Sequence, residues 1–324
     1  MRPHRPLLWI FTLIVAASAA SPWARAAADA DGAAMAELWV APGNIADRDV
    51  FFGPWGVGRA PDPGVTYTFV RRKTQGVNPG VVVRDPQGRE WHVKQPHPTV
   101  GVEGPVEVVL SRVLSAVGYH QPPVYFLPSF AMTDASGTHV EPGGRFRLHD
   151  PALTERGGWS WRANPFVGTP PYAGLLAILV MFNSADLKDS NNTVYEMARG
   201  ASTDRWYVVR DLGSALGSPS GLRPRRNDID RFERTSFIED VSPRGFVEFA
   251  FPNRYRNLVH ARITPADVGW AMGLMSGLTG PQWNDAFRAG GYAPDIAARY
   301  IRLLRARVAE GRRVAAIDPQ SGGR

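Results

Sequence analysis

The stretch Asp186-Leu187-Lys188-Asp189-Ser190-Asn191 decides the fold, together with Asp211-Leu212-Gly213, which begins 20 residues after Asn191. Residues 172–182 precede the first stretch and are apolar on all sides, which predicts a central buried helix. Residues 206–209 precede the second stretch and predict a short strand. Asp, Ser and Asn also favour ordinary turns, but so polar a loop after so apolar a helix favours a functional site.

Lys94 lies at the end of a predicted strand, upstream of these loops. Residues 81–84 and 90–94 are rich in β-formers and flank a Pro/Gly turn, which predicts a hairpin. Residues 103–117 follow, with apolar side chains at three- and four-residue steps, which predicts a helix that carries Glu107. A lysine at a strand end is usually a surface residue, but its place before this helix favours a functional role for Lys94.

The first half of the body is rich in predicted strands and the second half in predicted helices, which indicates an α+β architecture in two lobes. Other strands are expected near 67–70, 124–127 and 145–148, with a polar loop between the last two, and helices from 265 and over 294–312. The expected parts are an extended arm at 27–65, a β-rich N-lobe at 66–150, a helical C-lobe at 151–318 and a tail at 319–324.

The N-terminal residues have the parts of a secretory signal peptide. Basic residues precede an apolar run at 7–20, and Ala24-Arg25-Ala26 forms an A-x-A-like cleavage site, so residues 1–26 are predicted to be a removable leader. The run is short for a membrane span, which needs about 20 residues, and an uncleaved anchor is the alternative. The body is therefore expected to be periplasmic or secreted, with membrane contact only if the leader is uncleaved.

The composition excludes several classes of function. The 324 residues are 44% hydrophobic, enough for a packed core, and include no cysteine, which excludes disulfides, thiolate catalysis and Cys-ligated zinc. The histidines lack zinc-type spacing, and no G-x-S-x-G is present to support a serine hydrolase. The formal net charge of +7 falls further when the basic leader is removed, so a nucleic-acid partner is not expected.

The combined motifs resemble the protein-kinase-like fold, and in particular its atypical branches, which include the HipA kinases, the CotH spore-coat kinases and the secreted Golgi casein kinases. The resemblance rests on Lys94, the D-L-K-x-x-N stretch and the D-L-G stretch in this order, and it covers roughly residues 66–230. The helical part that follows fits a kinase large lobe. The chain also resembles a group of exported bacterial proteins, which carries no function with it.

The resemblance implies binding of ATP or another nucleotide in the first lobe. Lys94 would hold the α and β phosphates, and Glu107 would keep Lys94 in place, with Glu103 as the fallback. Gly76 and Gly80 would lie over the phosphates, although their loop lacks the G-x-G-x-x-G pattern.

The resemblance also implies roles in phosphoryl transfer, which depends mostly on positioning and charge neutralisation. Asp186 would orient the acceptor hydroxyl and take its proton, and Lys188 would steady the migrating phosphoryl charge. Asn191 and Asp211 would supply the oxygen ligands that Mg²⁺ or Mn²⁺ prefers. Gly213 would allow the backbone to bend after Asp211.

Some positions depart from the usual kinase pattern. Ser184-Ala185 stands where His-Arg usually precedes the catalytic Asp, so control by a phosphorylated activation loop is not expected. Leu212 replaces the usual Phe, and A-P-E is missing. The basic cluster Arg223, Arg225 and Arg226 is either a solvated loop or a site for an acidic acceptor.

Three hypotheses follow. The first is an exported ATP-type phosphotransferase that acts on a protein or glycan hydroxyl, although free ATP is scarce outside the bacterial cytoplasm. The second is an exported pseudokinase or ligand-binding module without catalysis. The third, an envelope structural protein, predicts no nucleotide binding.

Overall fold

The computed structural model describes residues 32, 34–74, 78–97, 102–200, 202–220 and 226–316. The described residues from Met35 onward belong to one compact unit, in which sheets and helices both contribute to the packing. The α+β architecture is therefore confirmed, whereas the division into two lobes stays a prediction. The predicted leader, Gly76, Arg223 and Arg225 lie outside the described residues.

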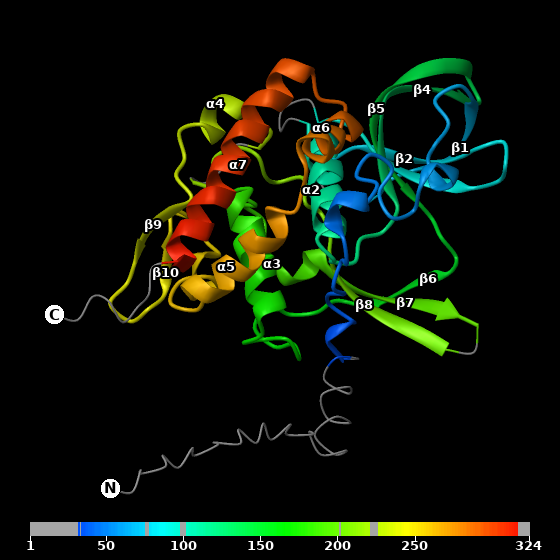
Figure 1. Ribbon diagram of the computed structural model, residues 1–324. Coiled ribbons are helices and arrows are strands. Elements are labelled where there is room, and N and C mark those ends of the chain that lie inside the picture. Colours follow the sequence, from blue (N-terminus) through cyan, green and yellow to red (C-terminus); the bar gives the residue numbers. More distant parts are fainter. Residues whose placement is uncertain are drawn as a thin grey trace, which may run out of the picture. The chain divides into compact units, whose positions relative to one another are not determined.

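Five strands of the N-terminal half form a closed barrel (Figure 1). They are β1 (Thr66–Arg72), β2 (Gly80–Arg84), β3 (Glu90–Lys94), β5 (Gly137–Leu148) and β4 (Val124–Asp134), in this order around the barrel. Neighbours pair antiparallel, except that β1 and β4 close the barrel in parallel, with Thr66 opposite Ala131. Trp91 and Val93 of β3 belong to the apolar core of the barrel, so alternation places His92 and Lys94 on the other face.

The β2–β3 hairpin confirms the sequence prediction. The prediction of a polar loop between 127 and 145 is wrong. The chain continues there as one long β4–β5 hairpin, paired out to Asp134 and Gly137. Residues 128–129 are exposed, whereas Phe130 and Met132 are buried in the barrel core. A strand with one solvated face contains many polar residues, which is why this segment has the composition of a loop.

Helix α2 (Gly104–Ala116) is buried along its whole length, and it packs against β4 and β5 on one side and against a C-terminal helix on the other. Pro105 occupies its first turn, where the missing amide hydrogen costs nothing. The predicted helix at 103–117 is confirmed with nearly the same bounds. Its position beside the barrel brings the acidic residues of its N-terminal turn toward the outer face of β3.

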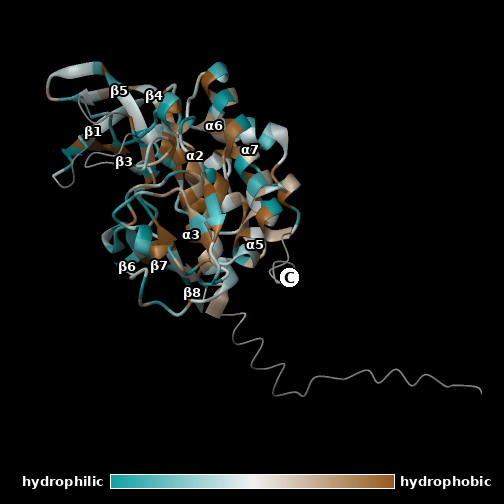
Figure 2. Ribbon diagram, turned by 90° about the vertical axis from the view of Figure 1, so that its left-hand side faces the viewer, coloured by the Kyte–Doolittle hydropathy of each residue, from teal (hydrophilic) through white to brown (hydrophobic). Residues whose placement is uncertain are grey.

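Helix α3 (Pro170–Met181) is the predicted apolar helix, and it lies among the other helices of the C-terminal half (Figure 2). Thr169 caps it, and ten consecutive residues from Pro171 to Val180 are buried. No helix in the described part of the chain is long and apolar enough for a membrane span.

The remaining helices, 3-10 turns and strands complete the fold. The helices are α4 (Ile229–Phe232), α5 (Pro265–Met275), α6 (Gly280–Ala289) and α7 (Pro294–Ala316), and the 3-10 turns are Ile45–Asp47, Val57–Arg59, Asp189–Asn191 and Arg256–Leu258. The strands β6 (Leu153–Gly157), β7 (Asn192–Arg199) and β8 (Ser202–Val209) form one sheet, and β9 (Ile238–Val241) pairs with β10 (Val247–Phe249). The predicted helices from 265 and over 294–312 correspond to α5 and α7.

Helix α6 was not predicted, although its start carries a recognisable capping box. The Thr279 side chain accepts a hydrogen bond from the Gln282 amide, and the Gln282 side chain accepts one from the Thr279 amide. Gln282 Nε2 also donates to the carbonyl oxygens of Ile45 and Arg48, at 2.7 and 2.9 Å. Through these bonds α6 holds the segment that precedes the barrel, in which Leu38 and Ile45 are buried.

Candidate functional site

Lys94 lies at the end of β3 and is the centre of the site. Its Nζ is 2.8 Å from Glu103 Oε2, 3.3 Å from Glu107 Oε2 and 3.3 Å from Asp211 Oδ1. The predicted contact of Lys94 with Glu107 is therefore present, and the fallback residue Glu103 is the nearer of the two. Three separate segments, β3, α2 and the D-L-G loop, thus meet at the ammonium group of Lys94, a residue that is 7% exposed.

The two acidic residues of α2 are also paired with arginines. Arg145 Nε, on β5, lies 2.9 Å from Glu107 Oε1, close enough for an ion pair although the N–H is not aligned for a hydrogen bond. Arg226 forms an ion pair with Glu103 Oε1. Burial opposes ionisation of Glu107, but the charges of Arg145 and Lys94 outweigh it and hold its pKa below the usual value. The site is thus a paired cluster of charges, as burial requires.

The environment of Arg226 matches neither of the two alternatives that the sequence suggested for the basic cluster. It is neither in a solvated loop nor free for an acidic acceptor, because its guanidinium binds Glu103 and its side chain is 21% exposed. Asn78 Nδ2 donates to the other oxygen of the same carboxylate. Glu103 is therefore held from three directions, by Lys94, Arg226 and Asn78.

Asp211 begins the D-L-G loop and has a left-handed backbone, with φ of 53°. Burial alone would raise the pKa of its carboxyl group, but Lys94 and Arg145 lower this pKa to about 2. The side chain is 52% exposed, so an ionised oxygen of Asp211 remains accessible from solvent. Since Asp211 itself takes the unusual backbone angle, the predicted role of Gly213 in the bend is wrong.

Gly213 is instead required by a close approach to helix α2. A Cβ atom at this position would lie 2.6 Å from the Cβ atom of Glu103 and 2.9 Å from its carbonyl oxygen. Only glycine allows the D-L-G loop to lie so close to the start of α2. This packing sets the distance between Asp211 and the acidic residues that contact Lys94.

Backbone hydrogen bonds hold the D-L-K-x-x-N loop beside the D-L-G loop. The Arg210 amide donates to the Asn191 carbonyl at 2.9 Å, and the Ala185 amide donates to the Ser214 carbonyl at 2.7 Å. Asn191 is 2% exposed, and its Nδ2 donates to the Asp186 carbonyl at 2.9 Å. This bond orients the Asn191 amide, so its Oδ1 faces away from the Asp186 backbone.

The Asp186 carboxylate is paired with two cations. Its Oδ2 lies 3.0 Å from Lys188 Nζ, and its Oδ1 accepts a hydrogen bond from Arg254 at 3.2 Å. The contact with Lys188 joins two residues that the sequence placed in the site. Arg254 was not predicted, because no sequence pattern connects it with a loop 68 residues earlier. The neighbouring Asn253 provides the link, since its Nδ2 donates to the Ala185 and Pro219 carbonyls.

Gly80 lies opposite Lys94 in the β2–β3 ladder. A Cβ atom there would lie 2.3 Å from the Val93 carbonyl oxygen, so close packing of the two strands explains this glycine. Its predicted place over phosphates stays a prediction.

Asn191 and Asp211 are the candidate metal ligands. The described residues contain no cluster of three or more His, Asp or Glu side chains that could hold a metal ion. An amide oxygen and an accessible, ionised carboxylate nevertheless suit Mg²⁺, which usually binds one or two carboxylates and keeps several waters.

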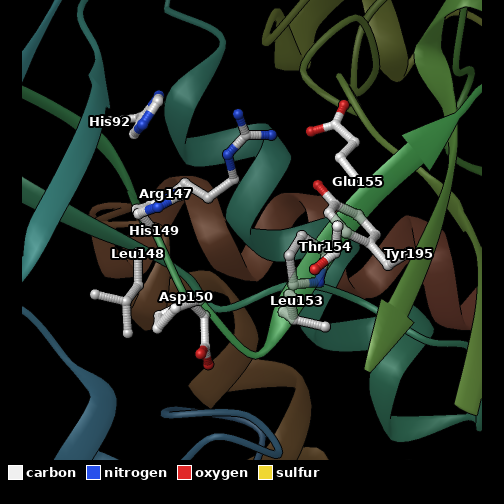
Figure 3. A pocket seen from close by; sticks show the side chains of 11 residues that line it. His92, Arg147, Leu148, His149, Asp150, Leu153, Thr154, Glu155 and Tyr195 are labelled. Atoms are coloured by element: carbon white, nitrogen blue, oxygen red, sulfur yellow. The ribbon is translucent and has the colours of Figure 1, made fainter. Parts of the chain in front are cut away.

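Lys94 lines one cavity, and a second cavity shares two of its lining residues. The smaller, of about 80 Å³, is lined by Lys73, Val81, Val82, His92, Val93, Lys94, Arg145 and Arg147. The larger, of about 330 Å³, is lined by residues of β3, β5, β6 and β7 and by the segment between β5 and β6 (Figure 3). His92 and Arg147 line both cavities, so the two adjoin.

The comparisons with known proteins give matches among solved structures. The chain matches no family model and no curated protein. Among solved structures it is similar to the crystal structure of the Helicobacter pylori proinflammatory kinase CtkA, with 11% sequence identity and a TM-score of 0.40. The match covers 80% of this chain and 98% of that chain.

Proposed function

We propose that the protein is a kinase-like phosphotransferase, which uses a nucleoside triphosphate and a divalent cation and acts on a protein or glycan hydroxyl. The observation that carries the proposal is the meeting of Lys94, Glu107 and Asp211 at one buried point, from three segments that the sequence resemblance had selected. The leader predicted at residues 1–26 supports a place in the periplasm or outside the cell.

In this mechanism the first lobe binds phosphate. The Lys94 ammonium neutralises phosphate charge, and Glu107, itself paired with Arg145, keeps that ammonium at the end of β3. The carboxylate of Asp211 and the amide oxygen of Asn191 would hold Mg²⁺ or Mn²⁺, which would neutralise phosphate charge when bound.

Asp186 is the group that accepts a proton. A bond forms between the acceptor hydroxyl oxygen and the terminal phosphorus, while the bond from that phosphorus to the departing nucleoside diphosphate breaks. The hydroxyl proton moves to the Asp186 carboxylate, and Lys188 and Arg254 lie close enough to offset the negative charge around it.

A binding module without catalysis is the second candidate, and one observation favours it. Both oxygens of Asp186 contact cations, Lys188 on one side and Arg254 on the other. Neither oxygen of this carboxylate is therefore without a cationic partner, so an acceptor hydroxyl would have to displace Lys188 or Arg254 to reach it. In this reading the site binds the nucleotide and transfers nothing.

Titration calorimetry with ATP and Mn²⁺ tests the two readings. Asp211→Asn removes a full charge from the metal site, so nucleotide binding should weaken at least about tenfold. Asp186→Asn should leave binding nearly intact and abolish transfer to any acceptor, since its partner is the hydroxyl. Asp285→Asn, a carboxylate on α6 that pairs with Arg288, is the matched control.

Unchanged nucleotide affinity in Asp211→Asn would contradict the metal role. Wild-type protein that binds nucleotide but transfers nothing to a panel of protein and glycan acceptors would favour the binding module. If the folded wild type binds no nucleotide at millimolar concentration, both readings fail.

A further inference from the structure

The larger cavity next to the phosphate site has an unusual lining for its position. It lies where the base of a nucleotide would be placed if its phosphates were at Lys94, because it shares His92 and Arg147 with the smaller cavity that Lys94 lines. Its volume of about 330 Å³ lies within the range of small-molecule sites, which begins at about 300 Å³. Instead of a purely apolar slot, the lining includes the charged side chains of Arg147 on β5 and Glu155 on β6.

Arg147 is the main feature of this cavity. Its guanidinium extends toward the side of the cavity where the Glu155 carboxylate lies (Figure 3). Burial lowers the pKa of Arg147, and the nearby charge of Arg145 lowers it further. Within the described part of the chain, Arg147 forms no hydrogen bond and no ion pair. Arg147 is partly buried, and its guanidinium borders the cavity, so a ligand there can accept from N–H donors that otherwise face water.

Glu155 places a carboxylate, a hydrogen-bond acceptor, in the lining of the same cavity. Arg210 lies 2.6 Å from its Oε1, and Thr193 donates to the same oxygen at 3.5 Å. Arg210 also donates to the Tyr195 hydroxyl at 3.3 Å, so one arginine positions both residues. Tyr195 is 5% exposed and lines the cavity. The cavity thus presents donors on one side, a carboxylate on another, and an aromatic side chain.

We infer that this cavity selects guanine, so that the proposed phosphotransferase uses GTP in preference to ATP; the inference rests on the proposed function. Arg147 would donate to guanine O6 and N7, the pair of adjacent acceptors that a guanidinium fork matches. Glu155 would accept from guanine N1–H and the N2 amino group, and Tyr195 would pack on the ring. Adenine would place its N6 donors against the donors of Arg147. Uracil separates its two carbonyls by an N–H, which does not match the fork.

Calorimetry of the full chain with GDP, ADP and UDP, each with Mn²⁺, tests the assignment without turnover. Wild type should bind GDP at least about tenfold more tightly than ADP or UDP. Arg147→Met keeps side-chain length and removes every donor, so it should weaken GDP binding about tenfold and leave ADP binding unchanged. Glu155→Gln should also reduce the preference. Arg205→Met, an exposed arginine on β8 with a side chain 51% exposed, should change nothing.

Lys94→Met separates this inference from the proposed function. Lys94 would contact phosphates, which the three nucleotides share, so this variant should weaken all three equally. If wild type binds ADP or UDP as tightly as GDP, or if Arg147→Met keeps the GDP preference, the guanine assignment is overturned and the proposed function stands. If folded wild type, checked by circular dichroism, binds none of the three, both are overturned.

Discussion

At the residue scale, the charged side chains of the site neutralise one another. Lys94 contacts Glu103, Glu107 and Asp211, and the first two are also paired with Arg226 and Arg145. Asp211 is the exposed member of the three carboxylates, so it is the one that can exchange Lys94 for a cation from solvent. Under the proposed function, metal binding at Asp211 would free Lys94 to contact phosphate.

The pH dependence of stability should report on His92, beside Lys94 on β3. Burial and the charge of Arg147 lower the pKa of His92 to about 4, whereas an unfolded histidine titrates near 6.5. Between these values the unfolded chain binds more protons, so stability is lost as pH falls from about 6.5 to 4. His92→Gln should remove on the order of 2 kcal/mol of that loss.

Urea unfolding at pH 7 and pH 5 would measure this effect. His139→Gln, on the β4–β5 hairpin with a side chain 37% exposed, is the matched variant that removes a histidine away from Lys94. An identical fall in stability for wild type and His92→Gln would contradict the assignment.

The sequence predicted those site residues that belong to local patterns along the chain. Lys94, Glu107, Asp186, Asn191 and Asp211 each belong to a short motif or to a periodic element. Their arginine partners could not be found in this way. Arg145, Arg226 and Arg254 reach the site only because the barrel, the segment after the D-L-G loop and a distant loop fold against each other, and no local spacing encodes those contacts.

At the element scale, the close packing of the D-L-G loop on the start of α2 fixes the site. Gly213 has no space for a side chain, since a Cβ atom would lie 2.6 Å from Glu103. The loop and the helix therefore move together, and any shift of α2 changes the position of Asp211 relative to Lys94.

The β4–β5 hairpin could not be predicted from its composition. Its solvated face is polar, so this segment has the residue types of a loop, and only pairing with a partner strand makes it a hairpin.

Gly213→Ala should destabilise the protein by about 1–3 kcal/mol, because the added methyl group overpacks the contact with Glu103. It should also weaken nucleotide binding, since Asp211 is displaced. Gly273→Ala is the control: it lies on the exposed side of α5 with no heavy atom within 4 Å of the added Cβ. That change should stabilise by about 0.5–1 kcal/mol. Equal urea midpoints for Gly213→Ala and wild type would refute the packing argument.

At the scale of the whole molecule, the last helix is fastened to the segment that precedes the D-L-K-x-x-N loop. Arg307 of α7 is 5% exposed and donates to the Met181 carbonyl at 2.6 Å and to the Asn183 side chain at 3.3 Å. It also donates to the Thr235 carbonyl and hydroxyl, both at 2.8 Å. One arginine thus joins α7, the end of α3 and the segment after α4.

Arg307→Met should lower the free energy of unfolding by about 3 kcal/mol, because it removes the donors of several buried acceptors at once. Arg312→Met, an exposed position on the same helix, should change stability by less than about 0.5 kcal/mol. Thermal and urea unfolding would compare the two variants. A loss below 1 kcal/mol for Arg307→Met would show that α7 is held mainly by its apolar face.

The parallel pairing of β1 with β4 has a consequence for the choice of acceptor. The contact that closes the barrel is short, because it pairs only Thr66–Thr68 of β1 with Ala131–Thr133 of β4. In the other sheet, the Tyr207 amide of β8 already donates to the Glu37 carbonyl. A protein substrate that bound as an added strand would therefore meet a competing partner in both places: three residue pairs where β1 meets β4, and the Glu37 carbonyl at Tyr207.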